Sequence, residues 1–214
     1  MEAFKTHRGL LATLDNANVD TDQIIPKQFL KSIKRTGFES ALFFDWRYLP
    51  DGKPDPAFSL NAPRFKGASI LVTRNNFGCG SSREHAVWAV MQYGFKAVIA
   101  PWVMRDGTRV NGFADIFRNN SRQNGLLTIE LKEEEVDAIF KAVDRYPGLE
   151  ATVDLDEQRV VLHLSEAEEA FHFDIDPGVK EHLQRGLDEI GLTLRHVSDI
   201  DAFEKAHDVQ MTQV

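Results

Sequence analysis

The sequence feature that most constrains the fold is an alternation of apolar runs, a glycine-bearing turn and an amphipathic helix in the middle of the chain. Ala68 to Thr73 form a short β-branched run, and Arg74 to Gly80 lead from it into a helix expected to begin near Ser82. Gly94 ends that helix, and a second apolar run follows at Ala97 to Ala100. This order is typical of a βαβ unit with two parallel strands joined by a right-handed crossover, so the sequence predicts an α/β fold.

The remaining segments extend this unit into a mixed sheet flanked by helices. A chain of 214 residues is long enough for one sizeable core, so we expect one domain over 1–214, with 177–214 as a helical C-terminal extension. The predicted segments are a hydrophobic stretch at Leu10–Leu14, a helical piece at Gln28–Ile33, a surface excursion at Pro50–Pro63, a helix at Phe113–Asn120, a strand at Leu127–Leu131, a helix at Lys132–Arg145, a hairpin of Thr152–Leu155 with Val160–Leu164, and two helices from Pro177 to His207 separated by Gly191.

Composition excludes several classes of function. The formal net charge of −8 repels a phosphate backbone, so we expect no nucleic-acid partner. No apolar run approaches the roughly 20 residues that span a bilayer, and the N-terminal stretch lacks the features of a signal peptide, so we expect a cytoplasmic protein without membrane contact. The single cysteine, Cys79, excludes an internal disulfide and also excludes an iron–sulfur cluster held by cysteines of this chain alone.

The segment from Asn76 to Ala86 carries the candidate chemistry. Its two glycines flank Cys79 where a strand must turn into a helix, and we expect them to let the backbone approach a ligand closely. The helix start offers unpaired N–H groups to an anion, and Arg83 adds a planar fork suited to a carboxylate. An alternative interpretation is purely structural, because Ser81-x-x-Glu84 has the pattern of a capping box.

The same segment, read as Gly78-x-Gly80-Ser81-Ser82-Arg83-Glu84-His85-Ala86, closely resembles the swivelling domain of the aconitase superfamily. The resemblance narrows to the family of 3-isopropylmalate dehydratase small subunits, and it runs through most of residues 5 to 200. It is supported by Asn18 to Leu30, Phe43 to Leu49 and Phe113 to Phe117. The fold that it implies is a swivelling β/β/α domain of the aconitase type.

The resemblance also implies site residues. The serine that matches Ser82 is the base that removes a proton from carbon, Ser81 is its hydrogen-bonding partner, and Arg83 holds a substrate carboxylate. A serine alkoxide needs preorganised positive charge, which the helix terminus and Arg83 would supply in part.

Three further residues belong to the loop that the family places at the substrate. Arg35 matches a second substrate-binding arginine, although a solvated surface cation is an equal alternative. Leu30 and Ile33 would meet an isopropyl group, and the alternative is that both anchor a helix to the core.

The reaction implied by the resemblance is hydro-lyase chemistry, which interconverts 2-isopropylmalate and 3-isopropylmalate through isopropylmaleate in leucine biosynthesis. It requires a [4Fe-4S] cluster, which we expect on a separate large subunit, in a heterodimer or heterotetramer, so this chain alone should be inactive and should bind neither cofactor nor metal. Alternative substrates are citraconate or methylmalate, dimethylmalate, and a homoaconitate-type tricarboxylate. An alternative from a different functional class is that the chain is a non-catalytic module that binds carboxylates.

Four further residues could be taken for functional residues, but we favour a structural role for each. Asp20 and Asp22 could be taken for metal ligands, but around a threonine they are expected to shape a turn and cap the following helix. Cys79 is interpreted as a small residue in a tight turn, and His85 as a packing or hydrogen-bonding residue.

Residues Val103 to Gly112 depart from the family pattern, in which the preceding strand leads almost directly into the next helix. The Asp-Gly pair within them predicts a turn-containing loop. We favour a surface insertion, and the alternative is that Arg105 or Arg109 approaches substrate or partner.

Overall fold

A computed structural model describes residues 1–31, 34–81, 83–165, 167–186, 191 and 193–207. Eight strands form one mixed sheet in the order β4-β3-β2-β1-β6-β7-β8, and β5 pairs with β3. The strands are β1 Thr6–Leu14, β2 Ile70–Thr73, β3 Ala97–Arg105, β4 Thr108–Val110, β5 Leu127–Lys132, β6 Glu150–Asp154, β7 Arg159–His163 and β8 Glu168–His172. The α-helices are α1 Thr21–Ile24, α2 Phe44–Arg47, α3 Glu84–Tyr93, α4 Asp115–Asn124, α5 Glu133–Arg145, α6 Pro177–Arg185 and α8 Val197–His207, and the 3-10 helices are η1 Lys27–Lys31, η2 Ser59–Asn61, η3 Pro63–Phe65 and η4 Leu194–His196.

Strand β1 joins two halves of the sheet. Its C-terminal part, Leu11 to Leu14, pairs in parallel with β2, which is parallel to β3, which is parallel to β5. Its N-terminal part, Thr6 to Leu10, pairs antiparallel with β6, and the meander continues through β7 and β8. The carboxyl ends of β1 and β2 therefore lie at one edge of the sheet, which is where α/β proteins place their ligands.

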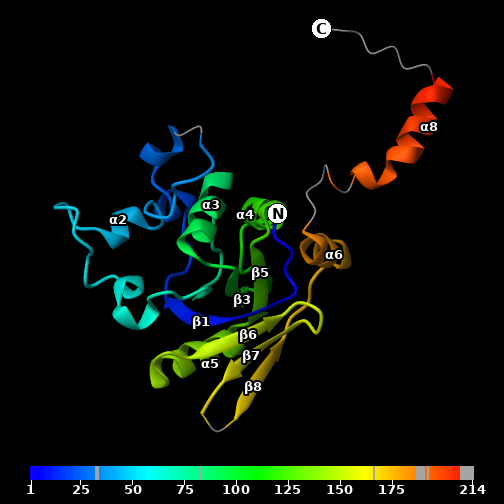
Figure 1. The fold of residues 1–214 in the computed structure, drawn as a ribbon. Helices are drawn as coiled ribbons and strands as arrows, with labels where there is room; N and C mark the ends of the chain where they lie inside the picture. Colours follow the sequence, from blue (N-terminus) through cyan, green and yellow to red (C-terminus); the bar gives the residue numbers. More distant parts are fainter. Residues whose placement is uncertain (32–33, 82, 166, 187–190, 192, 208–214) are drawn as a thin grey trace.

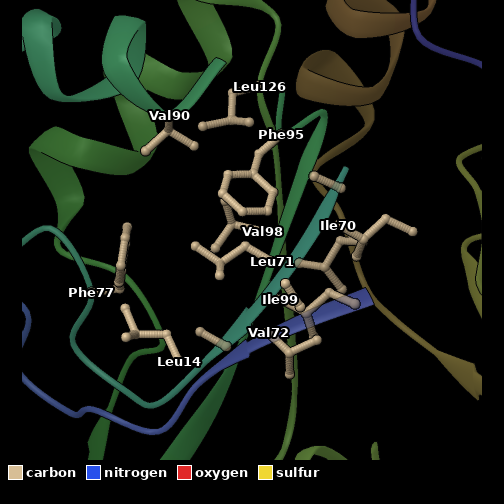
Figure 2. Packing of buried hydrophobic residues seen from close by; sticks show 14 of the residues in the cluster. Leu14, Ile70, Leu71, Val72, Phe77, Val90, Phe95, Val98, Ile99 and Leu126 are labelled. Carbon is tan, nitrogen blue, oxygen red and sulfur yellow. The ribbon is translucent and has the colours of Figure 1, made fainter. Parts of the chain in front are cut away.

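Helices cover the parallel half of the sheet on both faces. Figure 1 shows α3 and α4 on one side of these strands and α5 on the other. Helix α5 turns Val136, Ile139, Phe140 and Val143 inward, which is the helical spacing expected from the sequence. All four residues of β2 are buried, because both of its faces are covered. Figure 2 shows part of this core, in which Phe77, Val90 and Phe95 pack around the residues of β2 and β3.

The predicted βαβ unit is confirmed, with β2 and β3 parallel and α3 between them. The hairpin of β6 and β7 is also confirmed. The helical piece expected at Gln28 to Ile33 is a shorter 3-10 helix, Lys27–Lys31, and Ile33 lies outside the described residues. Strand β8 was not predicted, because Glu168, Glu169 and Ala170 on it are exposed and give no apolar alternation.

The segment Val103 to Gly112, expected as a loop, is mostly a β-hairpin. Strand β3 continues to Arg105 and pairs antiparallel with β4. Asp106 and Gly107 connect the two strands with φ of 49° and 74°, and two consecutive positive φ values suit the right-handed twist of a two-residue hairpin. The Asp-Gly turn was predicted correctly, but the flanking residues pair as strands.

The C-terminal part contains α6, the 3-10 helix η4 and α8 among the described residues. Gly191, which was expected to separate two helices, is itself helical. Helix α6 begins with Asp176 as N-cap, and α8 has no buried residue. The single domain and its C-terminal extension stay a prediction, since 187–190, 192 and 208–214 lie outside the described residues. Within the described part of the chain, no helix is long and apolar enough to cross a membrane.

Candidate active site

The candidate site is built on the active-site turn, by which we mean residues Gly78 to Ser81 between β2 and α3. Phe77 precedes it and is fully buried, with its ring against Phe43, Phe113 and Phe117 at centroid distances of 6.4, 6.5 and 5.2 Å. This aromatic anchor fixes the point at which the chain leaves the core. The turn itself emerges to the surface, where Gly80 and Ser81 are exposed.

Backbone conformation and close packing within this chain require glycine at both positions of the turn. Gly78 and Gly80 have φ of +76° and +80°, a region that other residues rarely adopt. A Cβ at Gly78 would overlap the ring of Phe117, and a Cβ at Gly80 would overlap the carboxylate of Asp20. The close approach expected here is therefore found, but it is made to side chains of this chain.

The loop before α1 holds the other side of the turn. The Val19 carbonyl accepts hydrogen bonds from the amides of Gly78 at 2.8 Å and Cys79 at 3.2 Å. The Thr21 amide donates to the Cys79 carbonyl at 3.0 Å, and the Thr21 hydroxyl donates to the Ser81 carbonyl at 3.2 Å. The active-site turn is thus bonded along its length to a segment about 60 residues earlier in the sequence.

Asp20 caps α1, as predicted. Its carboxylate accepts the Asp22 amide at 2.7 Å, and its own amide donates to the Gln23 side chain at 2.8 Å, which completes a capping box. Asp22 forms an exposed ion pair with Lys27 at 3.0 Å. The pattern around Thr21 therefore serves turn and cap geometry.

The alternative interpretation of Ser81 and Glu84 as a capping box is not supported by the described residues. Helix α3 begins at Glu84 with Arg83 as N-cap in an extended conformation, and no described side chain caps it. The Glu84 carboxylate instead accepts from the Asn124 side chain at 3.0 Å, because α4 packs beside α3. Within the described part of the chain, no side chain accepts from the first amides of α3, which suits them to bind an anion.

The three residues proposed for chemistry lie consecutively at this helix start. Ser81 and Arg83 are both exposed, and Ser82, between them, lies outside the described residues. An exposed arginine beside an uncapped helix start forms a positive surface suited to a carboxylate. Because this surface is open, it has the form of one wall of a site.

Cys79 and His85 have the environments expected of structural residues. Burial raises the pKa of the Cys79 thiol above its ordinary value, and the nearby Asp20 carboxylate adds to this effect, so the reactive thiolate is disfavoured. His85 packs against Phe38 and Trp88 with ring centroids 5.4 and 4.7 Å away.

Arg35 lies along α3. Its guanidinium carbon is 5.6 Å from the centre of the Trp88 ring, and its carbonyl accepts from the Gln92 side chain at 2.7 Å. Gln92 also accepts the Phe38 amide at 2.9 Å. Helix α3, which Arg83 precedes as N-cap, therefore also holds the loop that carries Arg35. The sequence did not reveal Gln92, whose only signal was its place one helical turn after Trp88.

Leu30 is partly buried and packs against the core, so its contacts agree with the anchoring interpretation as well as with a place near a substrate.

Arg105 is exposed on β3. Arg109 donates to Glu130 at 3.0 Å and stacks on Trp102 at 4.6 Å, so its guanidinium is held against the sheet. Among the described residues, no group of three or more His, Cys, Asp or Glu could hold a metal ion.

Comparison with known proteins agrees with this geometry. Residues 1–134, more than half of the chain, match the family model of the aconitase C-terminal domain, and residues 189–211 match that of the C-terminal domain of the 3-isopropylmalate dehydratase small subunit. A 3-isopropylmalate dehydratase small subunit from Desulforapulum autotrophicum is 58% identical over 204 residues, which cover 95% of each chain. One from Methylibium petroleiphilum is 51% identical over 213 residues, covering 95% of this chain and 93% of that relative.

A solved structure of 3-isopropylmalate dehydratase from Methanocaldococcus jannaschii has the same fold. Its TM-score is 0.62 at 24% identity, and the match covers 92% of this chain and 99% of that one. The predicted swivelling α/β fold of the aconitase type is thereby confirmed. The chain belongs to the family of 3-isopropylmalate dehydratase small subunits, within the aconitase family.

Proposed function

We propose that this chain is the small subunit of a cytoplasmic hydro-lyase that interconverts 2-isopropylmalate and 3-isopropylmalate through isopropylmaleate. The names of the two relatives with 58% and 51% identity support this substrate. The observation that carries the proposal is the start of α3, where exposed Arg83 and amides that no described side chain caps follow the turn with Ser81.

Each residue at this wall has a proposed task. Arg83 and the first amides of α3 bind a carboxylate of the substrate, because both present N–H donors and positive charge to it. Ser82 removes the proton from the substrate carbon on dehydration and returns one on rehydration. Ser81 supports Ser82 as a hydrogen-bonding neighbour. Binding at a helix terminus lowers the free energy of the negative charge that develops in both steps.

The departing hydroxyl requires a Lewis acid, which a [4Fe-4S] cluster supplies when it is bound. Residues of this chain do not fit such a cluster. Cys79 is the single thiol of the sequence, its pKa is raised by burial, and the backbone around it is fixed by bonds to Val19 and Thr21. We therefore place the cluster on a large subunit, which completes the site opposite the α3 wall.

The loop around Arg35 is proposed to recognise the remainder of the substrate. Gln92 and Trp88 hold it beside α3, the same helix whose N-terminal end follows Arg83. Arg35 would bind the second carboxylate, and Leu30 and Ile33 would contact the isopropyl group. Helix α3 thus aligns both arginines.

The proposal is tested by mixing this chain with its large subunit and assaying a panel of acids. We expect turnover of 2-isopropylmalate by the mixture and none by either subunit alone. In the mixture, Arg83→Lys should raise KM by about 10- to 100-fold, because a point charge replaces a bidentate fork. Arg64→Lys is the matched control, since Arg64 lies on η3 and pairs with Asp144.

Two outcomes would contradict the proposal. Preference of the complex for citraconate, dimethylmalate or homoaconitate would overturn the substrate. Unchanged kinetics of the Arg83→Lys complex would overturn the carboxylate-binding role of the α3 start.

A further inference from the structure

We propose that Glu130 on β5 is a positioning residue for the active-site turn, which it holds in place through the base of the β3–β4 hairpin. This inference rests on the proposed function, because it assigns a role in catalysis to the position of the turn. It also gives a task to the segment from Val103 to Gly112, which departs from the family pattern.

The Glu130 carboxylate lies where the hairpin returns to the sheet. One oxygen, Oε1, accepts the Gly112 amide at 2.8 Å, and the other, Oε2, accepts Arg109 Nη2 at 3.0 Å. Arg118 Nη1 on α4 is 3.9 Å from Oε1. The side chain is only 16% exposed, so these partners replace most of its hydration.

The residues fixed by Glu130 bond directly to the residues that precede the turn. The Gly112 carbonyl accepts the Phe77 amide at 2.9 Å, and the Asn111 carbonyl accepts the Asn76 amide at 3.0 Å. The Phe77 carbonyl in turn accepts the Ala114 amide at 3.0 Å. A continuous chain of hydrogen bonds therefore runs from Glu130 through Gly112 to Phe77, one residue before the active-site turn.

Close packing around Gly112 restricts its backbone, so its amide has little scope to find another acceptor. Gly112 is buried, and a Cβ on it would lie 3.0 Å from the Cβ of Ala100 on β3. Its amide, turned toward the sheet, needs an acceptor, and Glu130 is directly opposite Ala100 in the sheet register. Arg109, stacked on Trp102 at 4.6 Å, balances the charge of the carboxylate from the other side.

The turn is consequently held from two directions. The segment Val19 to Thr21 bonds to it directly, and the segment Asn111 to Ala114 bonds to its entry. If the second contact is lost, we expect the serines to move relative to the substrate, while Arg83 remains fixed by α3. Misplacement of a reacting group by about 1 Å can lower a rate by about 100-fold.

Two substitutions separate the effect of side-chain length from the effect of charge. Glu130→Asp keeps the charge but withdraws the carboxylate from Gly112, whereas Glu130→Gln keeps an oxygen at the same reach and removes the charge. In the complex with the large subunit, we expect Glu130→Asp to lower kcat by about 10- to 100-fold with KM within about threefold. Glu130→Gln should restore kcat to within about threefold of the unaltered complex.

Glu150→Asp is the matched control, because Glu150 on β6 is also a strand carboxylate paired with an arginine, Arg8 at 2.8 Å. Thermal unfolding and subunit binding are measured for each variant, so that kcat is compared only between folded, assembled complexes. An unchanged kcat in Glu130→Asp, or equal losses in Glu130→Asp and Glu130→Gln, would overturn the assignment. Failure of the proposed function would appear instead as normal turnover after substitution of Ser82, whatever the Glu130 variants show.

Discussion

At the scale of single residues, Gly80 and Asp20 act as one unit. The Asp20 carboxylate caps α1 and also occupies the space above Gly80, where a Cβ would overlap it. Replacing Gly80 by alanine therefore carries two costs, a strained backbone at φ of +80° and displacement of a helix cap. We expect Gly80→Ala to lower the free energy of unfolding by about 2–4 kcal/mol in urea titrations.

Gly52 is the matched control for this prediction. It has nearly the same φ, +81°, but nothing lies within 4 Å of the position of its Cβ. Gly52→Ala should therefore cost only the backbone strain, about 1–2 kcal/mol. Equal losses for the two variants would show that Asp20 does not contact the turn as described.

His7 gives a pH dependence of stability. Burial lowers the pKa of His7 below its ordinary value of about 6.5, the Lys96 ammonium adds to this effect, and the Glu2 carboxylate opposes it. Between the two pKa values the unfolded chain binds more protons than the folded one, so stability falls as the pH falls from above 6.5 toward the folded-state pKa. The contribution of neutral His7 to the free energy of unfolding is therefore fully present above the unfolded-state pKa.

The measurement is the free energy of unfolding of the unaltered chain minus that of His7→Gln, at several pH values between about 5 and 8. Subtraction removes the titration of all other groups that the two chains share. We expect the difference to decrease steadily as the solution is acidified. A difference that is flat or that increases would contradict the described environment of His7, including its 2.8 Å contact with Ser69.

At the scale of elements, α3 coordinates the two arginines of the proposed site. It begins just after Arg83, and more than two turns later Gln92 bonds to both the Arg35 carbonyl and the Phe38 amide. Gln92→Ala should free the loop that carries Arg35, because both bonds are lost. In the assembled complex we expect KM to rise about 3- to 10-fold with little change in kcat.

Gln92→Glu refines this test, since the glutamate can still accept the Phe38 amide but cannot donate to Arg35. We expect the KM of the Gln92→Glu complex to lie between that of the unaltered complex and that of the Gln92→Ala complex. If kcat falls while KM is unchanged, the loop does not act in substrate binding.

The elements also show what the sequence could and could not predict. The βαβ unit was predictable because its apolar runs and its glycines are continuous in sequence. The start of α3 was misplaced because Ser81 and Glu84 have the pattern of a capping box, whereas the partner of Glu84 is Asn124 on another helix. Contacts between distant segments, such as Glu130 with Gly112, leave no local pattern and could not be predicted from one sequence.

At the scale of the whole molecule, the described residues of the proposed site form an open surface. The active-site turn is bonded on two sides to segments far apart in sequence, yet Ser81 and Arg83 are exposed. The negative net charge of −8 makes this local positive surface a distinct feature. Such a wall becomes an active site only when a second surface closes over it.

The most direct test is the turnover of 2-isopropylmalate by the large subunit mixed with the unaltered chain or with Ser82→Ala. Ser165→Ala is the control, because Ser165 is an exposed serine between β7 and β8. We predict activity for the unaltered and control mixtures, none for the isolated chain, and a loss of about 10²- to 10⁴-fold in kcat for Ser82→Ala. Turnover by the isolated chain without its partner, or near-normal kcat with Ser82→Ala, would contradict the account.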